Sequence, residues 1–161
     1  MGIADLRRDY NLGGLRRADL GPDPIPQFQK WFGTVSQPTS RLRLIGIAGY
    51  KLWHAILGRA PADVNAMTLA TVSVDGVPSS RTVLLKGIDA RGFIFFTNYE
   101  SRKGRELAAN PQAALTFFWP ELERQVCVAG LASKLPAAES ESYFKSRPRG
   151  SQLGAWASNQ S

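Results

Sequence analysis

The stretch AMTLATVSVDGVPSSRTVLLK, residues 66–86, decides the fold, because two strand patterns lie on either side of a turn signal. Side chains alternate through its first part, and Asp75-Gly76 is a dipeptide that favours a tight hairpin turn. The returning segment alternates again, so its side chains divide between two faces: Arg81, Val83 and Leu85 on one, and Thr82, Leu84 and Lys86 on the other. The stretch therefore predicts an antiparallel hairpin.

Three further strand patterns follow the hairpin. They are FIFFTN (93–98), QAALTFFW (112–119) and RQVCVAGLASKL (124–135), with GIDARG (87–92) expected as a turn. Ser101 can cap a helix that ends at Asn110, before Pro111, and a second helix is expected over 136–146. The last segment, 147–161, reads as a loop. Five or more antiparallel strands with covering helices favour a small, mainly β barrel over a parallel sheet.

The first sixty residues have a different pattern. Asp23 and Pro24 are suited to the start of a short helix that runs through Phe32 and ends near Gly33. The segment RLRLIGIAGYKLWHAILGR (41–59) has apolar side chains at helical spacing with basic residues between them. This basic helix either packs on the domain, which is the commoner use of such a stripe, or touches a membrane or a partner.

Composition limits the class of protein. A chain of 161 residues with 43% hydrophobic and 20% charged side chains suits one globular domain. Its formal charge of +7 suits a nucleic acid, an anionic membrane or phosphorylated small molecules, and does not choose among them. The lone Cys127 lies in an alternating apolar run, which predicts a buried, inert thiol in a reducing compartment. The charged start and the lack of a long apolar run predict a soluble cytoplasmic protein without a membrane span.

A cluster of hydroxyl and cationic side chains begins one predicted helix. In FFTNYESRKGRE (95–106), Ser101, Arg102 and Lys103 fall where free backbone N–H groups and the helix dipole favour an anion. The alternative is a solvated helix start with ordinary surface cations. Arg81 and Lys86 strengthen the anion interpretation, since cations on an apolar strand are costly unless they are paired or bind a ligand.

Four segments in this order resemble the pyridoxamine 5′-phosphate oxidase family: RTVLLK (81–86), FFTNYESRKG (95–104), ERQV (123–126) and YFKSRPRGSQLGAWAS (143–158). The resemblance covers 65–161 and also the N-terminal segments 6–24 and 28–32. It implies an FMN-binding split β-barrel, antiparallel and Greek-key-like, that forms a homodimer with FMN at the subunit interface.

The resemblance also implies site residues by position. The implied FMN contacts are Arg81, Thr82, Val83, Leu84, Leu85, Lys86, Phe96, Thr97, Arg102, Lys103, Gln125, Gln160 and Ser161. The implied contacts of the substrate phosphate are Lys86, Tyr143, Arg147 and Ser151. The segment Arg7, Arg8, Asp9 and Tyr10 matches one that can close over the substrate, with a surface helix start as its alternative.

The activity that the resemblance implies belongs to vitamin B6 metabolism. It is FMN-dependent oxidation of pyridoxamine 5′-phosphate or pyridoxine 5′-phosphate to pyridoxal 5′-phosphate, with oxygen reduced to hydrogen peroxide. The single histidine, His54, lies outside the matched segments, so no metal site or catalytic triad is expected. The sequence has no recognised motif for reading nucleic acids, so none is expected as a partner.

Two features depart from the family pattern. Residues 33–64 read as an atypical insertion between the N-terminal arm and short helix (1–32) and the FMN-binding domain (65–161). The family's later segments, with a flavin-contacting Trp and an R-x-H-D-R motif, do not follow here, so the domain is expected to be C-terminally incomplete and its catalytic residues stay unassigned. Two hypotheses result: an active oxidase, or a truncated non-catalytic isoform or fragment that keeps FMN or pyridoxal phosphate binding or dimerisation.

Overall fold

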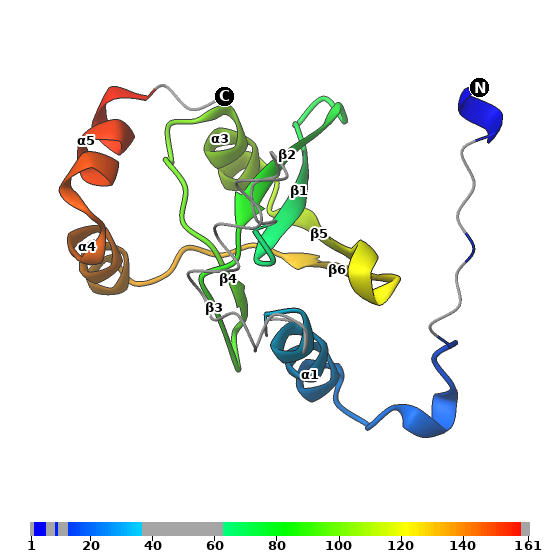
Figure 1. Ribbon diagram of the computed structural model, residues 1–161. Coiled ribbons are helices and arrows are strands. Elements are labelled where there is room, and N and C mark those ends of the chain that lie inside the picture. Colours follow the sequence, from blue (N-terminus) through cyan, green and yellow to red (C-terminus); the bar gives the residue numbers. More distant parts are fainter. Residues whose placement is uncertain (1, 6–8, 10–12, 37–62, 159–161) are drawn as a thin grey trace. The chain divides into compact units, whose positions relative to one another are not determined.

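The computed structural model describes residues 2–5, 9, 13–36 and 63–158 (Figure 1). They divide into two compact units: the first holds the described residues within 1–64 together with 118–125, and the second holds those within 65–117 and 126–161. The helices and 3-10 turns are η1 (Ile3–Asp5), η2 (Arg17–Asp19), α1 (Pro24–Ser36), α3 (Arg102–Ala109), η3 (Pro120–Leu122), α4 (Ala137–Ser146) and α5 (Arg149–Ala157). The strands are β1 (Ala66–Val72), β2 (Pro78–Leu84), β3 (Gly87–Asp89), β4 (Gly92–Ile94), β5 (Gln112–Trp119) and β6 (Arg124–Leu131).

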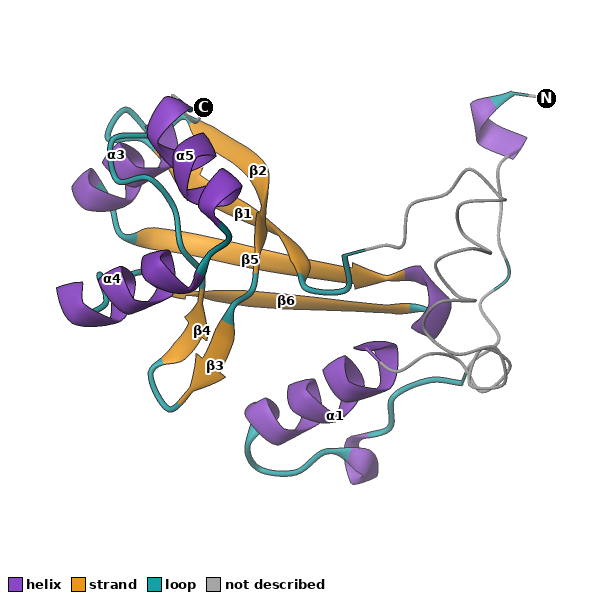
Figure 2. Ribbon diagram, turned by 60° about the vertical axis from the view of Figure 1, so that its left-hand side comes forward, coloured by secondary structure: helices purple, strands orange, loops and turns teal. Residues whose placement is uncertain are grey.

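The predicted hairpin is present and forms one side of the main sheet, with β2 as an edge strand. β1 and β2 pair antiparallel from Ala66↔Leu84 to Val72↔Pro78. Residues 73–77 close the hairpin, and Gly76 takes a φ of 78°, a left-handed conformation that glycine adopts without strain. The strand order of the four-stranded sheet is β2-β1-β5-β6, and β3 pairs with β4 in a separate two-stranded ribbon (Figure 2). The mainly antiparallel architecture with helices is therefore confirmed.

The core of the second unit follows the alternation of the strands. On β1, Met67, Leu69 and Thr71 point inward and are almost fully buried. Leu115 and Phe117 of β5 join them, and Phe117 is 0% exposed. Helix α3 packs against β1, as both views show. This contact holds the start of α3 beside the strands that carry the predicted ligand contacts.

The first unit has its own aromatic cluster. Phe28 of α1 packs against Phe32 and Trp119, with ring centroids 5.8 and 5.7 Å away, respectively. The indole N–H of Trp119 donates to the Val64 carbonyl at 3.0 Å, so the polar edge of this buried ring has a partner. The Asp23 side chain accepts from the backbone N–H of Ile25 at 2.9 Å, as expected for the residue before a helix.

The structure corrects several expected boundaries. Helix α1 continues to Ser36 rather than ending near Gly33. The expected turn 87–92 contains β3 and the first residue of β4, because Gly92, with φ 124°, lets the chain reverse between two short strands. The expected strand 93–98 ends early, since β4 stops at Ile94.

Two other expectations are wrong. Residues 147–161 are expected as a loop but contain helix α5, with Pro148 as the residue that immediately precedes it. Cys127 is exposed rather than buried, since on β6 it belongs to the outward-facing set of alternating side chains.

The predicted basic helix over 41–59 lies outside the described residues, and the proposed insertion over 33–64 stays a prediction. Within the ranges that the structure describes, no helix is both long enough and apolar enough to span a membrane.

Candidate functional site

A groove of about 1910 Å³ runs through the second unit between β2, the segment after β4, α3, and the two C-terminal helices. Small-molecule sites typically measure roughly 300–1,000 Å³, so this groove has room for two small ligands side by side. Eleven residues from the two predicted ligand sets line it: Arg81, Thr82, Val83, Leu84, Lys86, Phe96, Thr97, Lys103, Tyr143, Arg147 and Ser151.

The remaining predicted site residues lie elsewhere. Leu85 points into the core, and its backbone N–H donates to the Asn65 carbonyl at 2.8 Å. Arg102 is half-exposed and is not among the lining residues, while Gln125 belongs to the other compact unit. Asp9 is described and exposed. Five predicted residues fall outside the described ranges: Arg7, Arg8, Tyr10, Gln160 and Ser161.

Ser101 builds the start of α3 as predicted. Its Oγ accepts from the Gly104 N–H at 3.3 Å and donates to the Asn98 carbonyl at 2.6 Å. The Nζ of Lys103 donates to the same Oγ at 3.2 Å. A hydroxyl has one proton to donate and two lone pairs, so these three bonds satisfy Ser101 fully. The buried cap therefore fixes both the helix start and the Lys103 ammonium.

Gly104 allows the loop before α3 to approach this closely. A Cβ at this position would lie 2.3 Å from the Tyr99 carbonyl oxygen and 2.7 Å from that of Asn98. Both neighbours are backbone atoms, which cannot swing aside as the end of a side chain could. The glycine in SRKG is thus required by packing between the loop and the helix.

Two cations lie close together in the groove wall. Lys103 is only 5% exposed, and its pKa is lowered by burial and, to a lesser extent, by the nearby positive charge of Arg81. An anion bound here would relieve both effects, because it would compensate the buried ammonium and screen it from the guanidinium. The pair, together with the N-terminal end of α3, forms what we call the α3 anion subsite.

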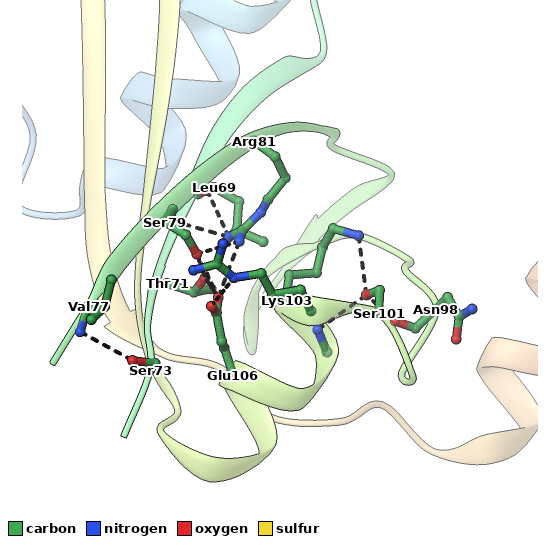
Figure 3. Close-up of polar contacts among 12 residues, drawn as sticks. Leu69, Thr71, Ser73, Val77, Ser79, Arg81, Asn98, Ser101, Lys103 and Glu106 are labelled. Atoms are coloured by element: carbon green, nitrogen blue, oxygen red, sulfur yellow. Dashed lines mark hydrogen bonds and ion pairs between the residues drawn. The ribbon is translucent and has the colours of Figure 1, made fainter. Parts of the chain in front are cut away.

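A buried carboxylate that was not predicted lies behind this subsite. Oε2 of Glu106 accepts from Thr71 Oγ1 at 2.5 Å, from Ser79 Oγ at 2.7 Å and from Arg81 Nη2 at 3.2 Å (Figure 3). Oε1 accepts from Arg102 Nε at 2.8 Å. The bonds from Thr71, Ser79 and Arg102, with that from Thr71 the strongest influence, lower the pKa of Glu106 to about 2.

A sequence signal for this network exists. Thr71 and Ser79 are hydroxyl residues at inward positions of the hairpin, where apolar side chains are expected, and the register pairs them directly across β1 and β2. Arg102 and Glu106 have the four-residue spacing of a helical ion pair. Neither signal indicates that the two pairs contact each other, and for this reason the sequence did not predict the cluster.

Another part of the groove lining carries the predicted substrate contacts. Tyr143 of α4 stacks on Phe96, with ring centroids 3.7 Å apart and an interplanar angle of 5°. Arg91 at the tip of the β3–β4 ribbon holds α4 in place, since Nη1 lies 2.8 Å from Glu139 Oε1 and Nη2 lies 2.6 Å from Asp89 Oδ2. Hydrogen bonds from Arg91 lower the pKa of both carboxyl groups.

Arg147 and Ser151 lie at the corner between α4 and α5. Arg147 is the C-terminal cap of α4, and Ser151 belongs to the first turn of α5 rather than to a loop. The Gln152 side chain donates to the Arg147 carbonyl at 2.8 Å and so fixes the corner. The groove is lined by all four predicted contacts of the substrate phosphate, which we call the α4–α5 subsite: Lys86, Tyr143, Arg147 and Ser151.

Comparison with known proteins identifies relatives of this chain. A family model described as pyridoxamine 5′-phosphate oxidase matches residues 59–161. The pyridoxine/pyridoxamine 5′-phosphate oxidase of Cupriavidus metallidurans is 54% identical over 159 residues, which cover 99% of this chain and 65% of that protein. The protein of the same name from Thermosynechococcus vestitus is 53% identical, again over 99% of this chain and 65% of its own length. The chain thus spans about 65% of the length of these relatives.

Among solved structures, PhzG from Burkholderia lata 383, in complex with tetrahydrophenazine-1-carboxylic acid, is similar with a TM-score of 0.70 and 30% identity. The match covers 89% of this chain and 61% of PhzG. The predicted split-barrel fold class is therefore confirmed. Because the family model covers well over half of the sequence, the chain belongs to the pyridoxamine 5′-phosphate oxidase family.

Proposed function

We propose that the chain binds FMN and uses it to oxidise pyridoxamine 5′-phosphate or pyridoxine 5′-phosphate to pyridoxal 5′-phosphate, with oxygen as the electron acceptor. The observation that carries the proposal is one groove lined by residues from both predicted ligand sets. The names of the relatives supply the substrate class.

The α3 anion subsite suits the FMN phosphate. The buried ammonium of Lys103 and the guanidinium of Arg81 are positively charged neighbours, and the positive end of the α3 helix dipole adds to their attraction for an anion. Arg102, on the first turn of α3, would reach the phosphate from its exposed side. FMN, when bound, supplies the acceptor for the hydride of the substrate.

The α4–α5 subsite suits the phosphate of the substrate. Lys86 and Arg147 bring two positive charges, and Tyr143 and Ser151 bring two hydroxyl donors, a set matched to a phosphate dianion. Lys86 lies between β2 and β3, and the other three side chains lie on α4, on α5 or at the corner between them. Together they would hold the phosphate at one end and orient the pyridine ring along the groove.

A second candidate substrate class comes from PhzG, whose crystal structure contains a tricyclic carboxylic acid. The volume of the groove would admit a ligand of that size. The two classes differ in the anion they present, since a carboxylate has one negative charge and a phosphate monoester has up to two. Two cations in the α4–α5 subsite favour the phosphate ester.

We also propose a cytoplasmic homodimer. Several large apolar side chains of the second unit are exposed in the single chain, including Leu131 at 71% and Trp156 at 82%. Burying such residues against a second copy would remove apolar surface from water. Sedimentation equilibrium should give twice the mass of the chain, and a monomer over the micromolar range would contradict this part of the proposal.

The test of the proposed activity is reduction of bound flavin. The purified chain is saturated with FMN, freed of excess flavin and mixed without oxygen with pyridoxamine 5′-phosphate, pyridoxine 5′-phosphate or a reduced tricyclic carboxylate. The proposal predicts loss of the blue flavin absorbance with a phosphorylated pyridine, and its return when oxygen is admitted. Loss of flavin absorbance with the tricyclic compound alone would favour the PhzG-like reaction. If no substrate reduces the bound flavin, the proposed activity is wrong and the chain is a flavin-binding protein without it.

A further inference from the structure

Glu106 lies at the centre of the buried network and contacts two arginines from different elements. Arg81 comes from β2 and Arg102 from the first turn of α3, and both lie within hydrogen-bonding distance of the same carboxylate. The side chain of Glu106 is only 7% exposed, so water competes little for these bonds. One buried carboxylate therefore connects two cations that the proposed function assigns to the FMN phosphate.

The hydrogen bonds of the network use only some of the N–H donors of each guanidinium. Arg81 uses Nη1 to donate to Thr71 Oγ1 at 2.5 Å and Nη2 to donate to Ser79 Oγ at 2.7 Å, besides its bond to Glu106. Arg102 uses Nε for its bond to Glu106. The Nε of Arg81 and the two Nη atoms of Arg102 take no part in this network. Each guanidinium is thus oriented by the carboxylate and keeps donors for a ligand.

The hydroxyl groups complete the network. Thr71 and Ser79 each accept from Arg81 and donate to Glu106, so one proton on each hydroxyl satisfies both contacts. The directions of these bonds depend on an ionised Glu106, because a carboxylate only accepts. A glutamine amide in the same place would present two N–H donors to neighbours that are themselves donors.

From this geometry we infer that Glu106 is a positioning residue for the flavin phosphate: it orients Arg81 and Arg102 before the ligand arrives, although it does not touch the ligand. The inference rests on the proposed FMN binding. Long side chains lose rotational freedom when a ligand immobilises them, and a network already formed in the fold removes that cost from the binding step.

The sign of the effect distinguishes positioning from simple electrostatics. Glu106 is a negative charge beside an anion subsite, so by Coulomb's law alone its neutralisation should strengthen phosphate binding. If its role is to orient the two arginines, neutralisation should weaken phosphate binding. A role confined to stability would change unfolding without changing the preference for a phosphorylated flavin.

The experiment compares FMN with riboflavin, which lacks the phosphate, by flavin fluorescence titration of the chain. Glu106→Gln should weaken FMN binding by about tenfold, the size expected for one charge-assisted contact, and should leave riboflavin binding unchanged. Glu141→Gln is the matched control, because it removes the same charge from an exposed ion pair with Lys145 on α4. If Glu106→Gln does not fold, Ser79→Ala removes one hydroxyl of the network and should give a smaller loss in the same direction.

A second measurement does not involve flavin. Hydrogen exchange at the Arg102 Nε–H, followed by NMR and assigned with Arg102→Lys, should be slow in the wild-type chain and much faster in Glu106→Gln. FMN affinity that is unchanged or tighter in Glu106→Gln, or unchanged exchange, overturns the inference while FMN binding by the wild type stands. A wild-type chain that binds FMN no better than riboflavin overturns the proposed function and this inference together.

Discussion

The rings of Phe96 and Tyr143 lie face to face, 3.7 Å apart between centroids and 5° from parallel. This separation is van der Waals contact, so no third ring fits between them. Phe96 belongs to the predicted FMN contacts and Tyr143 to the predicted substrate contacts. The stack therefore connects the two proposed ligand positions directly, and it fixes α4 against the segment that follows β4.

Substitution of Tyr143 should separate the roles of its ring and its hydroxyl. Tyr143→Phe keeps the stack and should weaken pyridoxal 5′-phosphate binding by about 1.5–3 kcal/mol, the value of one hydrogen bond to a charged group. Tyr143→Leu should in addition lower the free energy of unfolding by about 0.5–1.5 kcal/mol through loss of the aromatic pair. Equilibrium titration and urea unfolding measure the two effects. Equal stability of the Leu and Phe variants would show that the stack contributes nothing to the fold.

Gly104 should not tolerate a side chain. The methyl group in Gly104→Ala would collide with the Tyr99 carbonyl oxygen, at 2.3 Å, so either the loop or the start of α3 has to move. Overpacking of this kind costs about 1–3 kcal/mol of stability. Gly154→Ala is the control, because nothing lies within 4 Å of its new methyl group and alanine favours the helix interior of α5. The packing argument would be refuted if thermal unfolding showed the Gly104 variant to be as stable as the Gly154 variant or more stable.

The elements that the sequence predicted correctly are those set by local signals. Asp75-Gly76 marks the hairpin, and Ser101 and Pro111 bracket α3, so neighbours in sequence determine these structures. Helix α5 escaped prediction because its nine residues, RGSQLGAWA, include two glycines, which are weak helix formers. The Glu106 network was not predicted because it depends on tertiary contacts. Thr71 and Glu106, for example, are separated by 35 positions in the sequence.

Stability should depend on pH through Glu106. Its pKa in the folded chain is about 2, below the ordinary value of 4.5, so the folded state favours the ionised form. The stabilisation is present above pH 4.5 and is lost as the pH falls from there towards 2. Chemical denaturation at a series of pH values should show a steeper acid loss for wild type than for Glu106→Gln. Parallel curves for the two proteins would contradict the assigned ionisation.

Arg147 should distinguish the two proposed subsites. Arg147→Ala removes a cation from the α4–α5 subsite and leaves the α3 anion subsite intact, since these residues come from different elements. Pyridoxal 5′-phosphate binding should weaken by about 1.5–3 kcal/mol, as for a hydrogen bond to a charged group, and FMN binding should be unchanged. Equal loss of both ligands, or of neither, would be inconsistent with two separate phosphate sites.

The most direct test of the account measures how much the flavin phosphate contributes to binding. The quantity is the dissociation constant of riboflavin divided by that of FMN. It is compared between the wild-type chain and the double variant Arg102→Ala/Lys103→Ala. If the start of α3 holds the phosphate, FMN binding in the double variant should weaken by at least about 1.5–3 kcal/mol with riboflavin binding unchanged, so the ratio should fall towards one. An intact fold with the wild-type ratio would show that the phosphate binds elsewhere and would contradict the central claim.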